Sequence, residues 1–120
     1  MILHTTVGIG YETPWRQVEA MLKLAADRTE GLLKQPAPFV LRKELGDFAI
    51  THELNAYCSD PASMARIYSA LHDHILDVFN EYGVAIMTPS YEADPAEPKL
   101  VPKDQWYAPP AAAPSTPRTG

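Results

Sequence analysis

Two histidines and two aspartates within six consecutive positions have the side chains best suited to metal chemistry. His72, Asp73, His74 and Asp77 supply imidazole and carboxylate groups, which zinc accepts as ligands. The surrounding sequence has the periodicity of a helix, on which positions 72 and 74 lie about 200° apart. His74 and Asp77 could share one side of that helix, but two ligands do not complete a site. We therefore interpret these residues as a solvated helix face and expect no metal site.

Two other side chains could serve in catalysis, His52 as a general base beside Glu53 and Cys58 as a nucleophile. An unassisted histidine in a sheet is usually a structural residue. Cys58 is the single cysteine, which excludes an intramolecular disulfide and suits a reducing compartment. We interpret His52 as structural and Cys58 as a buried, inert thiol.

The sequence also lacks the familiar motifs of catalysis and cofactor binding. It contains no Gly-x-Ser-x-Gly motif, phosphate-binding loop or complete dinucleotide fingerprint. The run Gly8-Ile9-Gly10 resembles half of that fingerprint, but the third glycine is missing and Pro14 opens the next helix. We expect no catalytic residues, no cofactor-binding residues and no cofactor.

The balance of charge excludes some classes of partner. Ten Lys and Arg face fifteen Asp and Glu, so the net charge is −5, and no basic stripe is present to bind nucleic acid or anionic lipid. No apolar run approaches the roughly 18 residues of a membrane span, and the N-terminus lacks the features of a signal peptide. Because the chain begins directly inside a predicted strand, we expect it to be a piece of a longer protein.

The clearest predicted element is a helix between Asp60 and Gly83. Asp60 followed by Pro61 is typical of a helix start, and Gly83 of the left-handed residue after a helix end. Apolar side chains three and four positions apart form a single stripe that must lie on another element. The stripe comprises Met64, Ile67, Tyr68, Leu71, Ile75, Val78, Phe79 and Tyr82.

A first strand and a first helix precede this element. In the strand Ile2 to Tyr11 the odd positions are apolar or threonine, and the even positions form a face with few side chains. Thr13 is expected to cap the helix, with Pro14 in its first turn. Its inner stripe is predicted to comprise Trp15, Val18, Met21, Leu22 and Ala25.

Two further strands form a predicted hairpin, Phe39 to Leu45 and Phe48 to Tyr57, joined at the turn Gly46-Asp47. A short fourth strand is expected from Val84 to Met87, where Pro89 stops it. In the third strand Phe48, Ile50, His52, Leu54 and Ala56 share one face, and the other face is polar. A polar face indicates a sheet that is covered on one side only.

The order strand, helix, strand, strand, helix, strand predicts a ferredoxin-like βαββαβ sandwich of the α+β class. Its four-stranded antiparallel sheet would carry both helices on one face. Eight of the twelve prolines follow Met87, so we divide the chain into a domain at 1–88 and an extended or disordered proline-rich tail at 89–120. Lys99 to Tyr107 contains apolar side chains that could dock on this domain or on a neighbour.

Four segments, in the right order, resemble the C-terminal cytoplasmic α/β domain of MscS-type small-conductance mechanosensitive channels. The first is Val7-Gly8-Ile9-Gly10-Tyr11-Glu12-Thr13 with the helix Trp15 to Glu19 that follows it. The others are the glycine turn Leu45 to Ile50, the helix segment Ile67 to Ile75, and the strand with its closing proline, Tyr82 to Pro89. The resemblance covers about residues 3–92.

The resemblance implies a role without catalysis. In that family upstream membrane helices form a heptameric pore that opens under membrane tension, and the cytoplasmic domains build a cage with side portals. Ions and small osmolytes would pass these portals. The implied partners are other copies of the same subunit, with the domain on the cytoplasmic side of the inner membrane and itself soluble. The net negative charge of the domain, repeated in each subunit around the ring of the cage, would favour cations near the portals.

Three other functions share this fold and stay open at this stage. A small-molecule-binding regulatory module is the main alternative, since such domains often bind metabolites. An RNA-recognition domain would need basic residues and stacking aromatics on its middle strands, where only Tyr57 is present. An enzyme would have to use His52 or Cys58.

Overall fold

The computed structural model describes residues 1–87 and 100–113 of the 120-residue chain. Its principal elements run in the order β1 (Ile2–Gly10), α1 (Trp15–Arg28), β2 (Phe39–Leu45), β3 (Ala49–Tyr57) and α2 (Met64–Glu81). There are also two short 3-10 helices in the described residues. The first, η1 (Pro61–Ser63), leads into α2, and the second, η2 (Lys103–Gln105), lies in the C-terminal segment.

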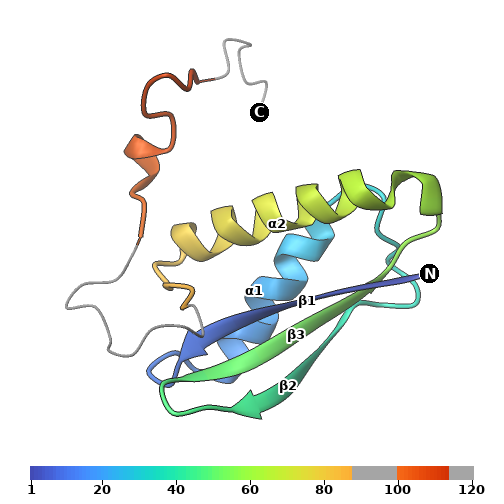
Figure 1. The fold of residues 1–120 in the computed structure, drawn as a ribbon, viewed down its shortest axis with the longest axis horizontal. Coiled ribbons are helices and arrows are strands. Elements are labelled where there is room, and N and C mark those ends of the chain that lie inside the picture. Colours follow the sequence, from blue (N-terminus) through green and yellow to red (C-terminus); the bar gives the residue numbers. More distant parts are fainter. Residues whose placement is uncertain (88–99, 114–120) are drawn as a thin grey trace.

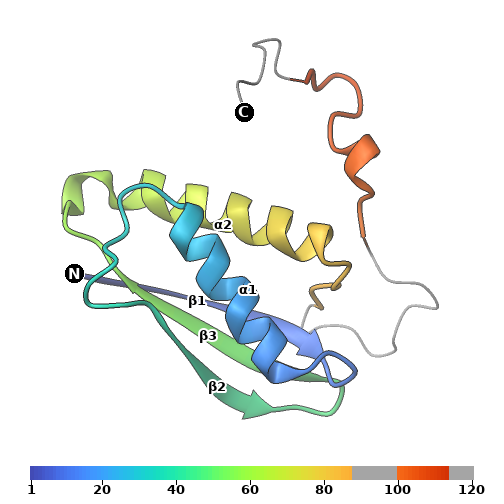
Figure 2. The same ribbon diagram turned by 180° about the vertical axis from the view of Figure 1, so that it is seen from behind.

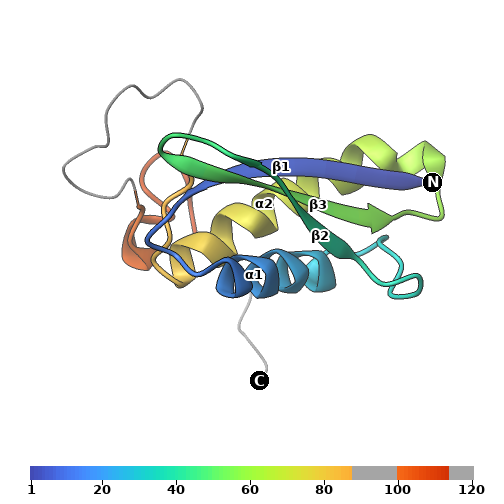
Figure 3. The ribbon, with the colours of Figure 1, turned by 90° about the horizontal axis from the view of Figure 1, so that it is seen from below.

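The three strands form one antiparallel sheet in the order β1-β3-β2, with β3 at its centre (Figure 1). Both helices lie on the same face of this sheet, as the view from behind and the view from below show (Figures 2 and 3). The α+β class and the one-sided arrangement are therefore as the sequence predicted. In the described part of the chain no helix or strand covers the opposite face of the sheet.

The predicted fourth strand, Val84 to Met87, is wrong for the part of the chain that the structure describes. Only Met87 pairs, through an isolated antiparallel bridge in which its amide donates to the Gly8 carbonyl at 2.8 Å. The reason lies at the end of α2, where the Val84 amide donates to the Phe79 carbonyl at 2.9 Å. Val84 thus completes the helix terminus and is not available as the first residue of a strand.

The two ends of the second helical segment follow the predicted signals. The Asp60 carboxylate accepts hydrogen bonds from the Ala62 amide and the Ser63 hydroxyl, so it caps the 3-10 turn that leads into α2. At the other end Gly83 has φ of +70°, the left-handed conformation that glycine adopts without strain. Its amide donates to the Asn80 carbonyl, which together with the bond of Val84 makes a Schellman motif.

The hydrophobic core lies between the sheet and the two helices. The inward face of β1, the middle of β3 and one stripe of each helix supply it, as the periodicity predicted. Its buried members include Val7, Ile9, Val18, Met21, Leu22, Ala25, Val40, Leu54, Leu71, Ile75, Val78 and Phe79. A smaller cluster of Leu3, Cys58 and Ile67 closes the end of the sheet near the N-terminus.

Three residues assigned to the core are instead exposed at the margins of the sandwich: Trp15 by 37%, Phe48 by 49% and Tyr82 by 54%. Trp15 and Tyr82 stand at the first turn and the C-cap of their helices, at the ends of the two apolar stripes. The predicted cap of α1 is also wrong. Pro14 occupies the N-cap position, and no side chain caps the helix.

The C-terminal segment contacts the domain at the end of α2. The Val101 amide donates to the side-chain oxygen of Asn80 at 3.2 Å, and the Trp106 indole donates to the Val101 carbonyl at 3.0 Å. Most residues of the segment 100–113 are exposed. Within the described residues, the contact of the predicted docking stretch, Lys99 to Tyr107, with the domain therefore rests on the hydrogen bond from Val101 to Asn80. Lys99 itself lies outside the described residues.

Candidate functional site

The histidines and aspartates of α2 do not come together with further ligands. The Nε2 atom of His72 forms a hydrogen bond of 2.8 Å with the Thr5 hydroxyl. The Tyr68 ring packs edge-on against the His72 ring, with 4.3 Å between the ring centres. His72 therefore ties α2 to β1. Among residues 1–87 and 100–113 no three His, Cys, Asp or Glu side chains are grouped closely enough to hold a metal ion.

Cys58 is buried next to the start of η1. Its Sγ donates to the Asp60 carbonyl at 3.4 Å, and its residue forms an isolated bridge with Leu32. Burial removes the thiol from solvent, and a reactive cysteine needs both access and a nearby positive charge. This position suits a packing role.

The most densely connected polar group of the domain joins α1 to β2, and we call it the Trp15 cluster: Trp15, Arg16, Glu19, Lys23 and Arg42. Arg42 of β2 donates to the Glu19 carboxylate at 2.8 Å, and Lys23, one helical turn beyond, pairs with the same carboxylate at 3.1 Å. Two cations thus share one anion. The hydrogen bonds from Arg42 and Lys23 hold the pKa of Glu19 below its usual value.

Trp15 lies between two guanidinium groups. Arg16 and Arg42 each place their Cζ atom 4.3 Å from the centre of the indole ring. Such cation–π contacts contribute about 0.5–1 kcal/mol each at partly exposed sites. The stack explains why Trp15, although it does not enter the core, has a fixed place at the first turn of α1.

His52 lies directly opposite Arg42 in the β2–β3 ladder, so both side chains belong to the inward face of the sheet. Its side chain is 1% exposed, and its Nδ1 has no hydrogen-bond partner among the residues that the structure describes. Burial, followed by the charge of Arg42, lowers the pKa of His52, while Glu19 opposes this effect. His52 is therefore a neutral, enclosed imidazole, which is a poor position for a general base acting on substrate.

His52 stands out in the sequence, whereas the Trp15 cluster does not. One signal was present, the spacing of four between Glu19 and Lys23, which favours an ion pair along a helix. The partnership of Arg42 depends on a β-bulge between Arg42 and Glu44, where the register of β2 against β3 shifts. No local pattern marks that bulge.

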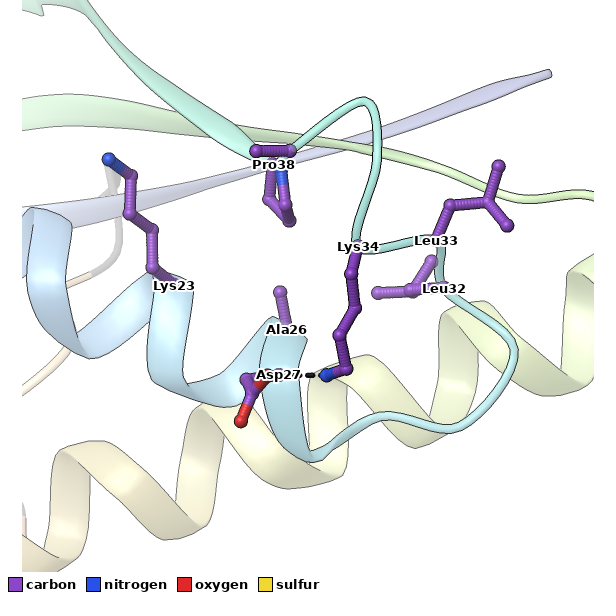
Figure 4. A pocket seen from close by; sticks show the side chains of 8 residues that line it. Lys23, Ala26, Asp27, Leu32, Leu33, Lys34 and Pro38 are labelled. Carbon is purple, nitrogen blue, oxygen red and sulfur yellow. Dashed lines mark hydrogen bonds and ion pairs between the residues drawn. The ribbon is translucent and has the colours of Figure 1, made fainter.

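A shallow cavity of about 220 Å³ opens between the second half of α1 and the loop that leads to β2 (Figure 4). Its floor is apolar, and at its rim an ion pair joins Lys34 to Asp27. Because Lys23 is likewise paired with Glu19, both ammonium groups at the cavity already have a partner. The cavity is lined by Lys23, Ala26, Asp27, Leu32, Leu33, Lys34, Ala37 and Pro38.

The uncovered face of the sheet is a surface available for contact with another molecule. Ile2, Phe39 and Leu41 are exposed there by 37%, 38% and 43%, and Ile2 stands opposite the partly exposed Tyr57. Asn55, in contrast, is only 5% exposed and donates to the Glu53 side chain at 3.3 Å. An apolar band with polar residues beside it is typical of an interaction surface.

Comparison with known proteins assigns the chain to a family. Residues 3–86 match the family described as mechanosensitive ion channel MscS, C-terminal. The chain belongs to the MscS family. The match spans β1 to the end of α2, so it covers every element of the sandwich. A search of curated proteins finds no significant match.

The fold agrees with that of an MscS channel of known structure. The crystal structure of Helicobacter pylori MscS in its closed state matches with a TM-score of 0.67 at 15% identity, over 79% of this chain. The chain spans about 38% of the length of that protein. Within the described residues of this MscS-family domain, neither helix is long and apolar enough to cross a membrane.

Proposed function

We propose that this chain is the cytoplasmic cage domain of a mechanosensitive channel that releases ions and small osmolytes under membrane tension. Its task would be assembly and filtering of solutes, without catalysis. The family match over residues 3–86 is the observation that carries this proposal. We further propose that the pore-forming membrane helices lie upstream of this domain in the intact subunit.

The uncovered sheet face supports an assembly role. A wall built from several subunits needs each copy to present a surface to its neighbours, and contacts between subunits are enriched in aromatic and aliphatic residues at their centre. The band of Ile2, Phe39, Leu41 and Tyr57 has that composition. We infer that this band meets other parts of a homo-oligomeric cage, a heptamer as in the family resemblance.

The domain boundaries and the finer fold are also part of the proposal. We place the ferredoxin-like domain at 1–88 and the proline-rich tail at 89–120, with the bridge of Met87 to Gly8 holding the chain that leaves α2 against the edge of β1. The hydrogen bond of Val101 to Asn80 supports a tail that returns to its own domain.

The acidic balance suggests a preference among permeating ions. Glu12, Asp47 and Glu53 would add negative charge near portals between subunits, which raises the local concentration of cations. Reversal of these three charges in an assembled channel should shift selectivity toward anions. Unchanged selectivity would remove them from the portal lining.

A chimeric channel tests the proposed function. In it, residues 3–86 of this chain replace the matching domain of Helicobacter pylori MscS, and the host is a bacterium that lacks its own mechanosensitive channels. We expect the chimera to assemble in the membrane and to protect cells from sudden dilution of the medium. Assembly without protection, or no assembly of a folded chimera, would contradict the role.

A matched pair of variants controls the chimera. Leu41→Asp places a charge on the apolar band, where Leu41 is 43% exposed, and should weaken assembly while the domain stays folded. Leu76→Asp changes a somewhat more exposed leucine, at 54%, on α2 and away from the sheet. If both variants assemble like the parent chimera, the sheet face is not the contact surface.

The alternative function is a regulatory module that binds a small molecule, and the cavity beside α1 is the observation that favours it. A volume of about 220 Å³ would hold a molecule of amino-acid size. A thermal-shift screen with amino acids and nucleotides distinguishes the two functions. Clear stabilisation by one ligand, lost in Ala37→Trp at an exposed position of the cavity lining, would support the regulatory module. Absence of stabilisation by any ligand would favour the cage role.

A further inference from the structure

The enclosed His52 and the charged cluster above it have a property that the cage role does not require. We propose that His52 is an acid-sensitive switch whose protonation releases the first turn of α1, at Trp15, from the edge of the sheet. The switch belongs to the domain itself and would operate whether or not the chain serves in a channel.

The surroundings of His52 favour the neutral ring over the protonated ring. An imidazolium donates from both nitrogens, and Nδ1 of His52 has no acceptor among the described residues. A buried donor without a partner is unfavourable, and more so when it carries a charge. Uptake of a proton from solvent therefore destabilises this arrangement.

The charges that face His52 come from two elements. β2 contributes Arg42 in the directly opposite position, and α1 contributes Glu19, whose carboxylate Arg42 and Lys23 already share. β1 presents Val7 opposite His52, and the buried residues of α2 and α1 are all apolar. With Arg16 on the far side of Trp15, the neighbourhood holds three cations and one anion before His52 gains its charge.

The same contacts identify the part that moves. Arg42 is both the cation opposite His52 and one of the two guanidiniums that hold Trp15, and its bond to Glu19 ties β2 to the start of α1. Displacement of Arg42 by a positive His52 breaks the ring contact and that ion pair together. The rest of α1 stays in place because Met21, Leu22 and Ala25 are buried in the core.

The pKa of His52 agrees with this geometry in direction. Burial and Arg42 lower the pKa of His52 from the ordinary value of 6.5, so the ring is neutral at pH 7 and gains its proton only below pH 6.5. Glu19 does not obscure the effect, because its own pKa is lowered from 4.5 and it stays ionised through this range.

The experiment uses Trp15 as its reporter in the 120-residue chain, with the second tryptophan removed by Trp106→Phe. Trp15 emission is followed from pH 8 to pH 5 together with far-ultraviolet circular dichroism. We expect a red shift with a midpoint below pH 6.5, while the helical signal persists. Absence of a transition, or loss of the helical signal in the same step, would overturn the switch.

Three variants assign the transition to His52. His52→Leu should abolish the red shift, whereas His4→Gln, an exposed histidine, and His72→Gln, on α2, should keep it. Persistence of the shift in His52→Leu overturns the proposal. If His52→Leu does not fold, His52→Gln answers in its place: its side chain is polar but does not titrate, so the red shift should be absent, and a red shift that persists overturns the switch.

Discussion

Met87 and Gly8 lie so close together that a side chain at position 8 would crowd the bridge between them. The Met87 amide donates to the Gly8 carbonyl at 2.8 Å, and a Cβ at position 8 would lie 3.0 Å from the Met87 carbonyl oxygen. This contact holds the chain that leaves α2 against the free edge of β1. It marks the position where the sequence predicted a fourth strand.

Replacement of Gly8 by a bulky residue should therefore loosen this connection. In Gly8→Val the added methyl groups meet the Met87 backbone, and we expect a loss of about 1–2 kcal/mol in the free energy of unfolding, typical of overpacking. Thr6→Val is the control, since Thr6 is exposed two residues earlier on the same face of β1. Urea denaturation of both variants measures the difference, and equal stabilities would show that the bridge tolerates a side chain.

The core side of α2 should be far more sensitive than its solvent side. Leu71 is 1% exposed, and Leu71→Ala should cost about 2–5 kcal/mol through lost burial and the cavity that remains. Leu76 on the same helix is 54% exposed, and Leu76→Ala should change stability by less than about 0.5 kcal/mol. Thermal unfolding of the pair tests which face packs on the sheet.

The end of α2 should depend on the backbone freedom of Gly83. Its φ of +70° disfavours L-residues, although a Cβ there would meet no atom within 4 Å. Gly83→Ala should therefore destabilise the domain by about 1 kcal/mol through backbone strain alone. Gly83→Asn should cost less, because asparagine adopts this conformation more readily. If denaturation curves show that Gly83→Ala is as stable as the parent chain, the requirement for glycine at this position is refuted.

The ion pairs of Glu19 should give the domain a component of stability that acid removes. Because the folded-state pKa is lowered from 4.5, the carboxylate stabilises the fold above pH 4.5, and this contribution disappears as the pH falls through the folded-state value. Glu19→Gln should lose about 0.2–1 kcal/mol at pH 7, less in high salt, and the difference from the parent chain should shrink as the pH falls below 4.5. Glu30→Gln, at an exposed position without an ion pair among the described residues, is the control.

Much of the fold could be predicted from sequence because it rests on local rules. The stripe and end signals of α2 involve residues a few positions apart, and β2 begins and ends at the predicted residues, Phe39 and Leu45. The fourth strand failed where two local signals competed. The β-branched side chain of Val84 favours a strand, but its amide completes the Schellman motif after Gly83.

The candidate site could be predicted only in part. His52 was placed on the inward face of β3 by alternation alone, and the structure confirms its burial. Its relationship to Arg42 was not visible, because a bulge in β2 sets which residue stands opposite. Trp15 was assigned to the core by its hydrophobicity, whereas its place is decided by two guanidiniums, one of them from β2.

The sequence by itself determined the elements, the one-sided sheet and the family, because periodicity, capping residues and turn glycines act over short distances along the chain. Only the tertiary structure decided that a neutral histidine lies opposite Arg42, whose guanidinium, like that of Arg16, contacts the Trp15 ring. It also decided that β1 keeps most of one edge free of the described residues. Both outcomes depend on strand register and on how a helix end competes with a strand. These are balances between segments distant in sequence, which no single segment encodes.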